Sequence, residues 1–185
     1  MRKSKFFKIL TGVALSTLIL AACNSEDAGK KADKDPSDVE VVFIPKMTGN
    51  AFFESGNDGA QEMAEKIGFN VKYDGAPEGT VANQVQIINS AVNSGADAIA
   101  ISSVSSDGLN QALQKALDAG IKVVTWDSDV DPKYRSVYIN QGTPDILGAM
   151  LVDMAAGQLD NPDDAQKVAW FYSSPTVPDQ NSWVD

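Results

Sequence analysis

The chain of 185 residues contains no histidine and a single cysteine, Cys23. Histidine is the most frequent general base near neutral pH and the commonest metal ligand, so its absence removes the usual route to both roles. One cysteine cannot form a disulfide within the chain. Basic residues are also few, 15 against 25 acidic ones, and the net charge of −10 argues against a nucleic-acid partner.

The apolar content, in contrast, is sufficient for a folded core. Hydrophobic residues make up 43% of the chain and charged residues 22%, which is typical of a globular protein. A chain of this length can form one domain or slightly more.

The first 22 residues predict an export signal rather than a folded element. A basic region runs from Arg2 to Lys8, an apolar region follows from Ile9 to Leu20, and small residues precede Cys23. The alternative is an uncleaved membrane anchor, but the apolar region is short for a span. Residues 24–38 are charged and lack apolar periodicity, so they predict a flexible tether.

Leu20-Ala21-Ala22-Cys23 also resembles a bacterial lipobox. This resemblance implies that Cys23 is lipidated and becomes the first residue of the mature chain. The protein would then work at the outer face of the cytoplasmic membrane, and the lipid anchor would be its only contact with the membrane.

From Val39 onward, apolar runs suited to strands alternate with helical patterns. The runs occupy residues 39–45, 69–74, 97–102, 121–126, 136–140 and 167–173. Several runs are apolar on both faces, as a parallel sheet covered by helices on both sides requires. A repeat of about 25–30 residues fits successive right-handed βα units. The pattern therefore predicts a doubly wound parallel α/β fold.

Four helices are expected between these runs. The first begins near Asn50, the second lies between Thr80 and Gly95, the third ends at Gly120, and Thr143-Pro144 opens the fourth. The apolar face of the first helix consists of Phe52, Gly56, Ala60, Met63 and Ile67. The inner face of the fourth helix consists of Leu147, Leu151 and Met154.

Ligands of open α/β sheets bind outside the carboxyl ends of the strands. Polar groups follow the predicted strands at Lys46, in residues 127–129, at Asn140-Gln141 and in residues 173–181. These groups suit a hydroxylated ligand, because carboxylates accept hydrogen bonds from hydroxyls and lysine donates them. Phe52 and Phe53 could cover one face of a ring, although core packing is the alternative for such a pair.

Other chemistries have weaker support. Asp127, Asp129 and Asp131 alternate as in a calcium loop, but Pro132 stands where such a loop needs glycine, so no metal is expected. Ser102-Ser103 and Ser105-Ser106 could be nucleophiles only beside a base, and we expect them to form a loop and cap a helix. No dinucleotide or P-loop motif is present, and no cofactor is predicted.

Five segments resemble the sugar-type periplasmic binding proteins of ABC importers, and within that group the autoinducer-2 receptors of the Lsr type. They are VVFIPKMTGNAFFESGNDGAQEMAEKIG, ANQVQIINSAVNSGADAIAISSVSSDGLNQAL, VVTWDSDV, YINQGTPDILGAMLVDM and FYSSPTVPDQNSWV. The resemblance implies a type I fold of two lobes that holds a cyclic, polyhydroxylated ligand and delivers it to a permease. By motif position, the ligand contacts would be Lys46, Asp127, Asp179 and Gln180.

The same resemblance implies a division of the chain. Residues 1–22 would be the signal peptide, 23–38 the lipidated cysteine and tether, 39–140 the amino-terminal lobe, and 141–185 the incomplete start of the carboxyl-terminal lobe. The second lobe would be truncated, as in a fragment.

Two rival functions remain open from the sequence, and the predicted export signal argues against a third. A receptor for a pentose or deoxyhexose sugar, such as ribose or rhamnose, would use the same polar groups. An exported carbohydrate-active enzyme would need a paired acid and base, for which Asp127 and Asp179 are conceivable. A sugar-responsive repressor shares the fold, but it would carry a DNA-binding headpiece in place of residues 1–38.

Overall fold

A single parallel sheet organises the protein in the computed structural model, which describes residues 34–161 and 163–184. Its strands are β1 (Glu40–Ile44), β2 (Asn70–Tyr73), β3 (Ala98–Ile101), β4 (Lys122–Trp126) and β5 (Val137–Ile139). The order is β2-β1-β3-β4-β5, parallel at every pair, which confirms the predicted doubly wound fold. The strand order reverses between β1 and β3, where ligand sites of such sheets form.

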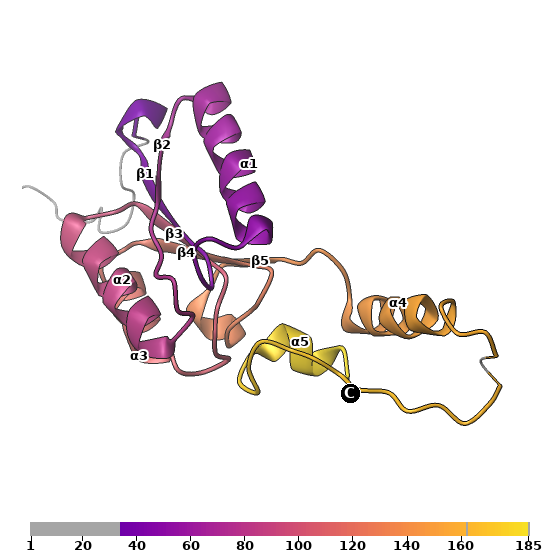
Figure 1. Cartoon of the computed structure of the whole chain (residues 1–185). Helices are drawn as coiled ribbons and strands as arrows, with labels where there is room; N and C mark the ends of the chain where they lie inside the picture. The colour runs from indigo at the N-terminus through magenta and orange to yellow at the C-terminus, as the bar shows by residue number, and fades with distance from the viewer. Residues whose placement is uncertain (1–33, 162, 185) are drawn as a thin grey trace, which may run out of the picture. The chain divides into compact units, whose positions relative to one another are not determined.

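Three helices connect the first four strands: α1 (Ala51–Ile67), α2 (Val81–Ser94) and α3 (Asn110–Asp118). Figure 1 shows α1 on one side of the strands and α2 and α3 on the other. The Asn50 side chain accepts a hydrogen bond from Phe52 N, and that of Thr80 accepts one from Asn83 N. Gly95 ends α2 in the left-handed conformation. The boundaries predicted at these positions are therefore confirmed.

The core lies between the sheet and the helix pair α2 and α3. Alternate residues of β1, β3 and β4 face it and are at most 1% exposed: Val42, Ile44, Ile99, Ile101 and Val123. They pack against Ile88, Ala91, Leu109, Ala112, Leu113 and Ala116 of the helices and their approaches. The sheet and these two helices therefore share one apolar core.

The opposite face of the sheet is covered differently from the prediction. On α1 the buried residues are Phe53 and Ala64, whereas Phe52, Met63 and Ile67 of the predicted apolar face are 51%, 45% and 55% exposed. A Cβ at Gly56 would lie 3.2 Å from Trp126 of β4 and 3.8 Å from Phe43 of β1, so the start of this stripe lies over the sheet. The far end of the stripe, at Met63 and Ile67, faces solvent, while Phe53 and Ala64 make the buried face of the helix.

Gln84 of α2 ties the ends of two strands together from inside the protein. Its amide nitrogen donates to Pro45 O at 3.0 Å and Ser102 O at 2.7 Å, and its amide oxygen accepts from Val104 N at 3.0 Å. The residue is 2% exposed. One side chain thus fixes the backbone beyond both β1 and β3.

Replacing Gln84 with methionine should lower the free energy of unfolding by about 2–4 kcal/mol, because three buried backbone groups lose their partners. Urea denaturation of the variant measures this loss. Gln86→Met is the matched control, since Gln86 lies on the same helix but is exposed, and it should leave the midpoint unchanged. Equal midpoints for the two variants would contradict the bracing role.

The chain beyond β5 forms α4 (Pro144–Ala156) and α5 (Pro178–Ser182). Thr143 caps α4 as predicted, accepting from Ile146 N. However, α4 has no buried residue, and Leu151 and Met154 of its expected inner face are 41% and 64% exposed. Its close neighbour is α5, because a Cβ at Gly148 would lie only 2.6 Å from Trp183 O.

Two further predictions differ from the structure. Residues 167–173 form neither strand nor helix, because no neighbouring strand among the described residues offers them backbone hydrogen bonds; the Phe171 side chain is 93% exposed. The end of the predicted tether is ordered: Pro36–Asp38 is a 3-10 helix, and the Asn70 side chain donates to Ser37 O.

The predicted signal peptide, Cys23 and most of the tether lie outside the described residues. Within the described ranges, none of the helices has both the length and the apolar character of a membrane span.

Candidate functional site

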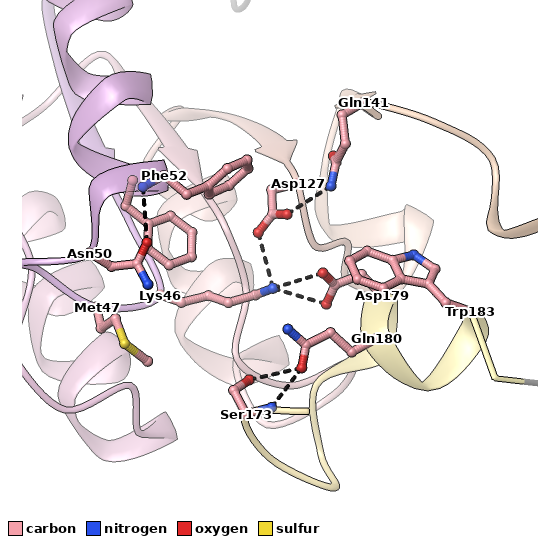
Figure 2. Close-up of a pocket in the computed structure, with 11 residues that line it drawn as sticks. Lys46, Met47, Asn50, Phe52, Asp127, Gln141, Ser173, Asp179, Gln180 and Trp183 are labelled. Carbon is pink, nitrogen blue, oxygen red and sulfur yellow. Dashed lines mark hydrogen bonds and ion pairs between the residues drawn. The ribbon is translucent and has the colours of Figure 1, made fainter. Parts of the chain in front are cut away.

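Lys46 lies immediately beyond β1, where Pro45 ends the strand. Its side chain is 6% exposed and its ammonium group contacts two carboxylates (Figure 2). The Nζ atom lies 3.0 Å from Asp127 Oδ2, and 2.9 and 3.0 Å from the two oxygens of Asp179. A buried lysine is stable only when its charge is compensated, and here two anions compensate one cation.

Asp127 follows β4 in an unusual backbone conformation. Its φ of 61° lies in the left-handed region, the only positive φ at a non-glycine position among the described residues. Two hydrogen bonds to β5 hold this turn: Asp127 N donates to Ile139 O, and the Tyr138 hydroxyl donates to Asp127 O at 2.8 Å. Burial and nearby carboxylates raise the pKa of Tyr138 to about 12, so this hydroxyl keeps its proton at neutral pH.

Asp179 and Gln180 reach the same place from α5. Asp179 is 8% exposed and accepts a hydrogen bond of 2.5 Å from the Ser128 hydroxyl in addition to those from Lys46. Val177, just before the helix, is 3% exposed and anchors the segment by apolar burial. The Gln180 side chain accepts from both the backbone nitrogen and the hydroxyl of Ser173.

These groups line a cavity of about 260 Å³. The wall contains every predicted ligand contact, including Phe52 and Phe53, and consists of Lys46, Met47, Asn50, Phe52, Phe53, Asp127, Gln141, Ser173, Asp179, Gln180 and Trp183. Phe53 is buried, whereas Phe52 is half exposed and packs edge to face against it at 5.2 Å. The structure therefore brings together residues that lie up to 134 positions apart, while their role as ligand contacts remains a prediction.

The charges in this cavity make it rich in hydrogen-bond acceptors. An ammonium group has three donors, and the Lys46 group already faces three carboxylate oxygens. A ligand oxygen can accept from Lys46 only by replacing one of these contacts. A ligand that donates hydroxyl hydrogens to the carboxylates fits the site as it stands.

Three polar residues at the site are absent from the predicted contacts. Gln141 donates to Asp127 Oδ1 at 2.9 Å, Ser102 donates to Asp127 Oδ2 at 2.6 Å, and Ser128 bonds Asp179. Gln141 and Ser128 belong to the polar strand ends expected from the sequence. For Ser102 the expectation is a loop and a helix cap, and Ser102 does lie in the loop after β3. No serine side chain caps α3, whose N-cap residue is Leu109.

The three aspartates of the calcium-like pattern have separate partners. Asp127 contacts Lys46, Asp129 binds Arg135 through two hydrogen bonds of 3.1 and 2.7 Å, and Asp131 pairs with Lys133. Burial favours the neutral form of Asp129, but hydrogen bonds from Arg135 and Thr125 outweigh it and lower the pKa of this carboxyl.

Because the native Asp129 carboxyl binds a proton less readily than in the unfolded chain, it stabilises the fold above the unfolded pKa of about 3.9. Asp129→Asn should lower the free energy of unfolding by about 1 kcal/mol at pH 7, and the difference should vanish as the pH falls through the lowered native pKa. Denaturation from pH 7 to pH 2 measures this. Arg135→Gln should remove the same pH-dependent contribution; a difference that persists at pH 2 would contradict the assignment.

A polar, partly aromatic cavity beyond the carboxyl ends of a doubly wound parallel sheet is the usual position of a small-molecule site in α/β proteins. Sequence comparison specifies the family. The chain belongs to the periplasmic binding protein domain family, whose match covers residues 41–185.

The chain is also similar to individual known proteins. The chain is 33% identical to the fructose import binding protein FruE of Bifidobacterium longum over 125 residues, covering 67% of this chain and 37% of FruE. It is 31% identical to the D-ribose/D-allose-binding protein of Pseudomonas aeruginosa, covering 64% of this chain and 39% of that protein. The structure of LsrB from Clostridium saccharobutylicum in complex with AI-2 superposes with a TM-score of 0.77 at 52% identity, covering 79% of this chain and 46% of LsrB. The chain thus spans less than half the length of each of these three relatives.

Proposed function

We propose that this chain is the ligand-binding part of an extracytoplasmic solute receptor of an ABC importer, and that its ligand is autoinducer-2, a cyclic polyhydroxylated furanose. The observation that carries this proposal is the buried lysine held between two carboxylates in an aromatic-walled cavity. Such a site accepts hydroxyl hydrogens and offers apolar surface to a small ring.

The choice of autoinducer-2 rests on similarity. The chain is 52% identical to an LsrB crystallised with AI-2, against 33% and 31% for the relatives named for fructose and for ribose or allose. The second candidate is a pentose or deoxyhexose sugar such as ribose or rhamnose. The acceptors in the cavity suit any small polyol, and two relatives are named for sugars.

The proposed mechanism is closure over the ligand without chemistry. Residues 39–140 would form one lobe and residues 141–185 the start of the other. Asp179 belongs to the second of these parts and contacts Lys46 of the first. The site therefore contains residues of both parts. An acid–base pair for glycoside hydrolysis needs carboxyls in different protonation states. Here both carboxylates share one lysine, which favours a binding role over an enzymatic one.

Isothermal titration calorimetry of the full chain with autoinducer-2, ribose and rhamnose tests the proposal. We expect autoinducer-2 to bind at least tenfold more tightly than either sugar. Tighter binding of ribose or rhamnose would establish the second candidate. Failure of all three to bind would overturn the receptor assignment, and release of product from incubated glycosides would support an enzyme.

The proposed anchor has its own test. Lipidation of Cys23, followed by delivery of the ligand to a permease, would keep the protein at the outer face of the cytoplasmic membrane. Cys23→Ser should move the expressed protein from the membrane fraction to the soluble fraction, because a diacylated cysteine supplies the attachment. Ser25→Ala, two residues away, is the control and should stay with the membrane. Equal partitioning of the two variants would contradict a lipid anchor.

A further inference from the structure

Two serines lie directly behind the carboxylates of the site. Ser102 follows β3 and Ser128 follows Asp127, and both are 0% exposed. Neither lines the cavity, so neither can touch a bound ligand in this arrangement. Each hydroxyl instead donates a short hydrogen bond to a carboxylate that does line it, at 2.6 Å to Asp127 and 2.5 Å to Asp179.

The serine bond determines which oxygen of Asp127 is open to a ligand. A carboxylate has two oxygens with two acceptor positions each. Oδ2 accepts from Ser102 and contacts Lys46, so both of its positions are taken. Oδ1 accepts only from Gln141 among the hydrogen bonds of the described residues, and one position stays open.

Asp179 shows the same asymmetry with the oxygens exchanged. Oδ1 accepts from Lys46 and Ser128, which fills its two positions. Oδ2 accepts from Lys46 alone among the described residues. Each aspartate therefore has one carboxylate oxygen with a free acceptor position. Both carboxylates contact the same lysine nitrogen.

The backbone around both serines is fixed. Ser102 N donates to Ile44 O, and Ser102 O accepts from buried Gln84. Ser128 O accepts from Ser103 N at 3.1 Å. Ser103 is equally buried, but its hydroxyl donates to Ser105 O and contacts neither carboxylate.

We propose that Ser102 and Ser128 are positioning residues that set ligand specificity. By filling Oδ2 of Asp127 and Oδ1 of Asp179, they restrict a ligand to one acceptor on each aspartate, and so select an uncharged ligand with two hydroxyl donors that reach both. The inference rests on the proposed function, because it assumes that the cavity binds a hydroxylated molecule. An anionic ligand is disfavoured since two carboxylates face one ammonium group.

The binding test compares Ser102→Ala and Ser128→Ala with Ser103→Ala in the full chain. Whichever of autoinducer-2, ribose and rhamnose binds the unaltered chain is titrated together with its monodeoxy analogues. We expect each of the first two variants to bind about tenfold more weakly and to lose at least fivefold in discrimination against a deoxy analogue, while Ser103→Ala keeps the original ratio. Unchanged ratios in both variants, or an equal change in Ser103→Ala, would overturn the proposal.

Crystal structures of the variants provide a test that needs no ligand. In Ser102→Ala the Asp127 carboxylate should rotate, or a water should take the place of the hydroxyl at Oδ2. An Asp127 side chain that keeps its orientation without a new donor would overturn the positioning role. Failure of every ligand to bind the unaltered chain would instead overturn the proposed function, and the crystal structures would still decide the role of the serines.

Discussion

Replacing Lys46 with methionine is expected to lower the free energy of unfolding by about 3–5 kcal/mol. The lysine is 6% exposed and is the cation that contacts both Asp127 and Asp179, which are themselves 6% and 8% exposed. Methionine preserves the apolar stem but leaves two buried carboxylates facing each other without compensation. Urea denaturation at pH 7 measures the effect, and the unfolding midpoint should fall accordingly.

A matched control tests whether the loss of stability depends on the burial of the ion pair. Lys133→Met removes an exposed lysine whose partner Asp131 lies at the same distance of 3.0 Å, and it should leave the midpoint unchanged. Adding Asp179→Asn to the Lys46→Met variant should recover part of the lost stability, because one of the uncompensated charges disappears. Identical midpoints for the Lys46 and Lys133 variants would show that the cluster does not depend on its lysine.

Replacing Asp127 with asparagine is expected to weaken ligand binding between about 10-fold and 100-fold, the equivalent of one charge-assisted hydrogen bond. Asparagine keeps the size of the side chain and tolerates the left-handed backbone found at this position. The loss of affinity would therefore result from removing the carboxylate and not from a changed backbone turn. Calorimetric titration with the ligand of the unaltered chain measures it.

Asp127→Ala should bind still more weakly, because alanine is also strained at a φ of 61°. Asp131→Asn removes a carboxylate of the same loop that does not line the cavity and should bind as the unaltered chain does. Unchanged affinity in both Asp127 variants would refute the assignment of this residue to the site.

Local sequence signals predicted the elements whose determinants lie within a few residues. The Asn50 and Thr80 caps act over two or three positions, and left-handed Gly95 ends its helix without tertiary help. The predicted apolar face of α1 was wrong. Periodicity establishes that a helix has an apolar face, but it does not establish how the helix is rotated against the sheet. The buried Phe53 ring packs against Trp126 at 5.8 Å between ring centroids, and Trp126 is too far along the chain for a local pattern to reveal this contact.

The strand predicted at residues 167–173 shows a second limit of prediction from sequence. A strand depends on hydrogen bonds to a neighbour, and Val168 and Phe171 have the right composition but are 71% and 93% exposed. Composition alone thus identifies a segment that can pair, not one that does.

For the site, the ends of the expected strands predicted where polar groups gather, and family resemblance predicted which of these groups would contact a ligand. Lys46 and Asp127 could be expected because each follows a strand that ends at the same edge of the sheet. Ser102 could not, since its bond to Asp127 joins residues 25 apart in the chain and depends on the exact turn after β4. The hydroxyls that orient the carboxylates carry no sequence signal beyond their type.

The two hydrogen bonds between Asp127 and β5 also predict how the protein responds to a pulling force. The chain leaves the sheet at Ile139, and the last residues of this strand hold the backbone of Asp127 through Ile139 O and the Tyr138 hydroxyl. We therefore expect tension applied to the segment after β5 to load the Asp127 turn, through these two bonds and through Gln141, whose side chain donates to Asp127 Oδ1. A force-probe experiment that pulls from residue 141 should detect this as a first yielding event, and Tyr138→Phe should lower the force at which it occurs.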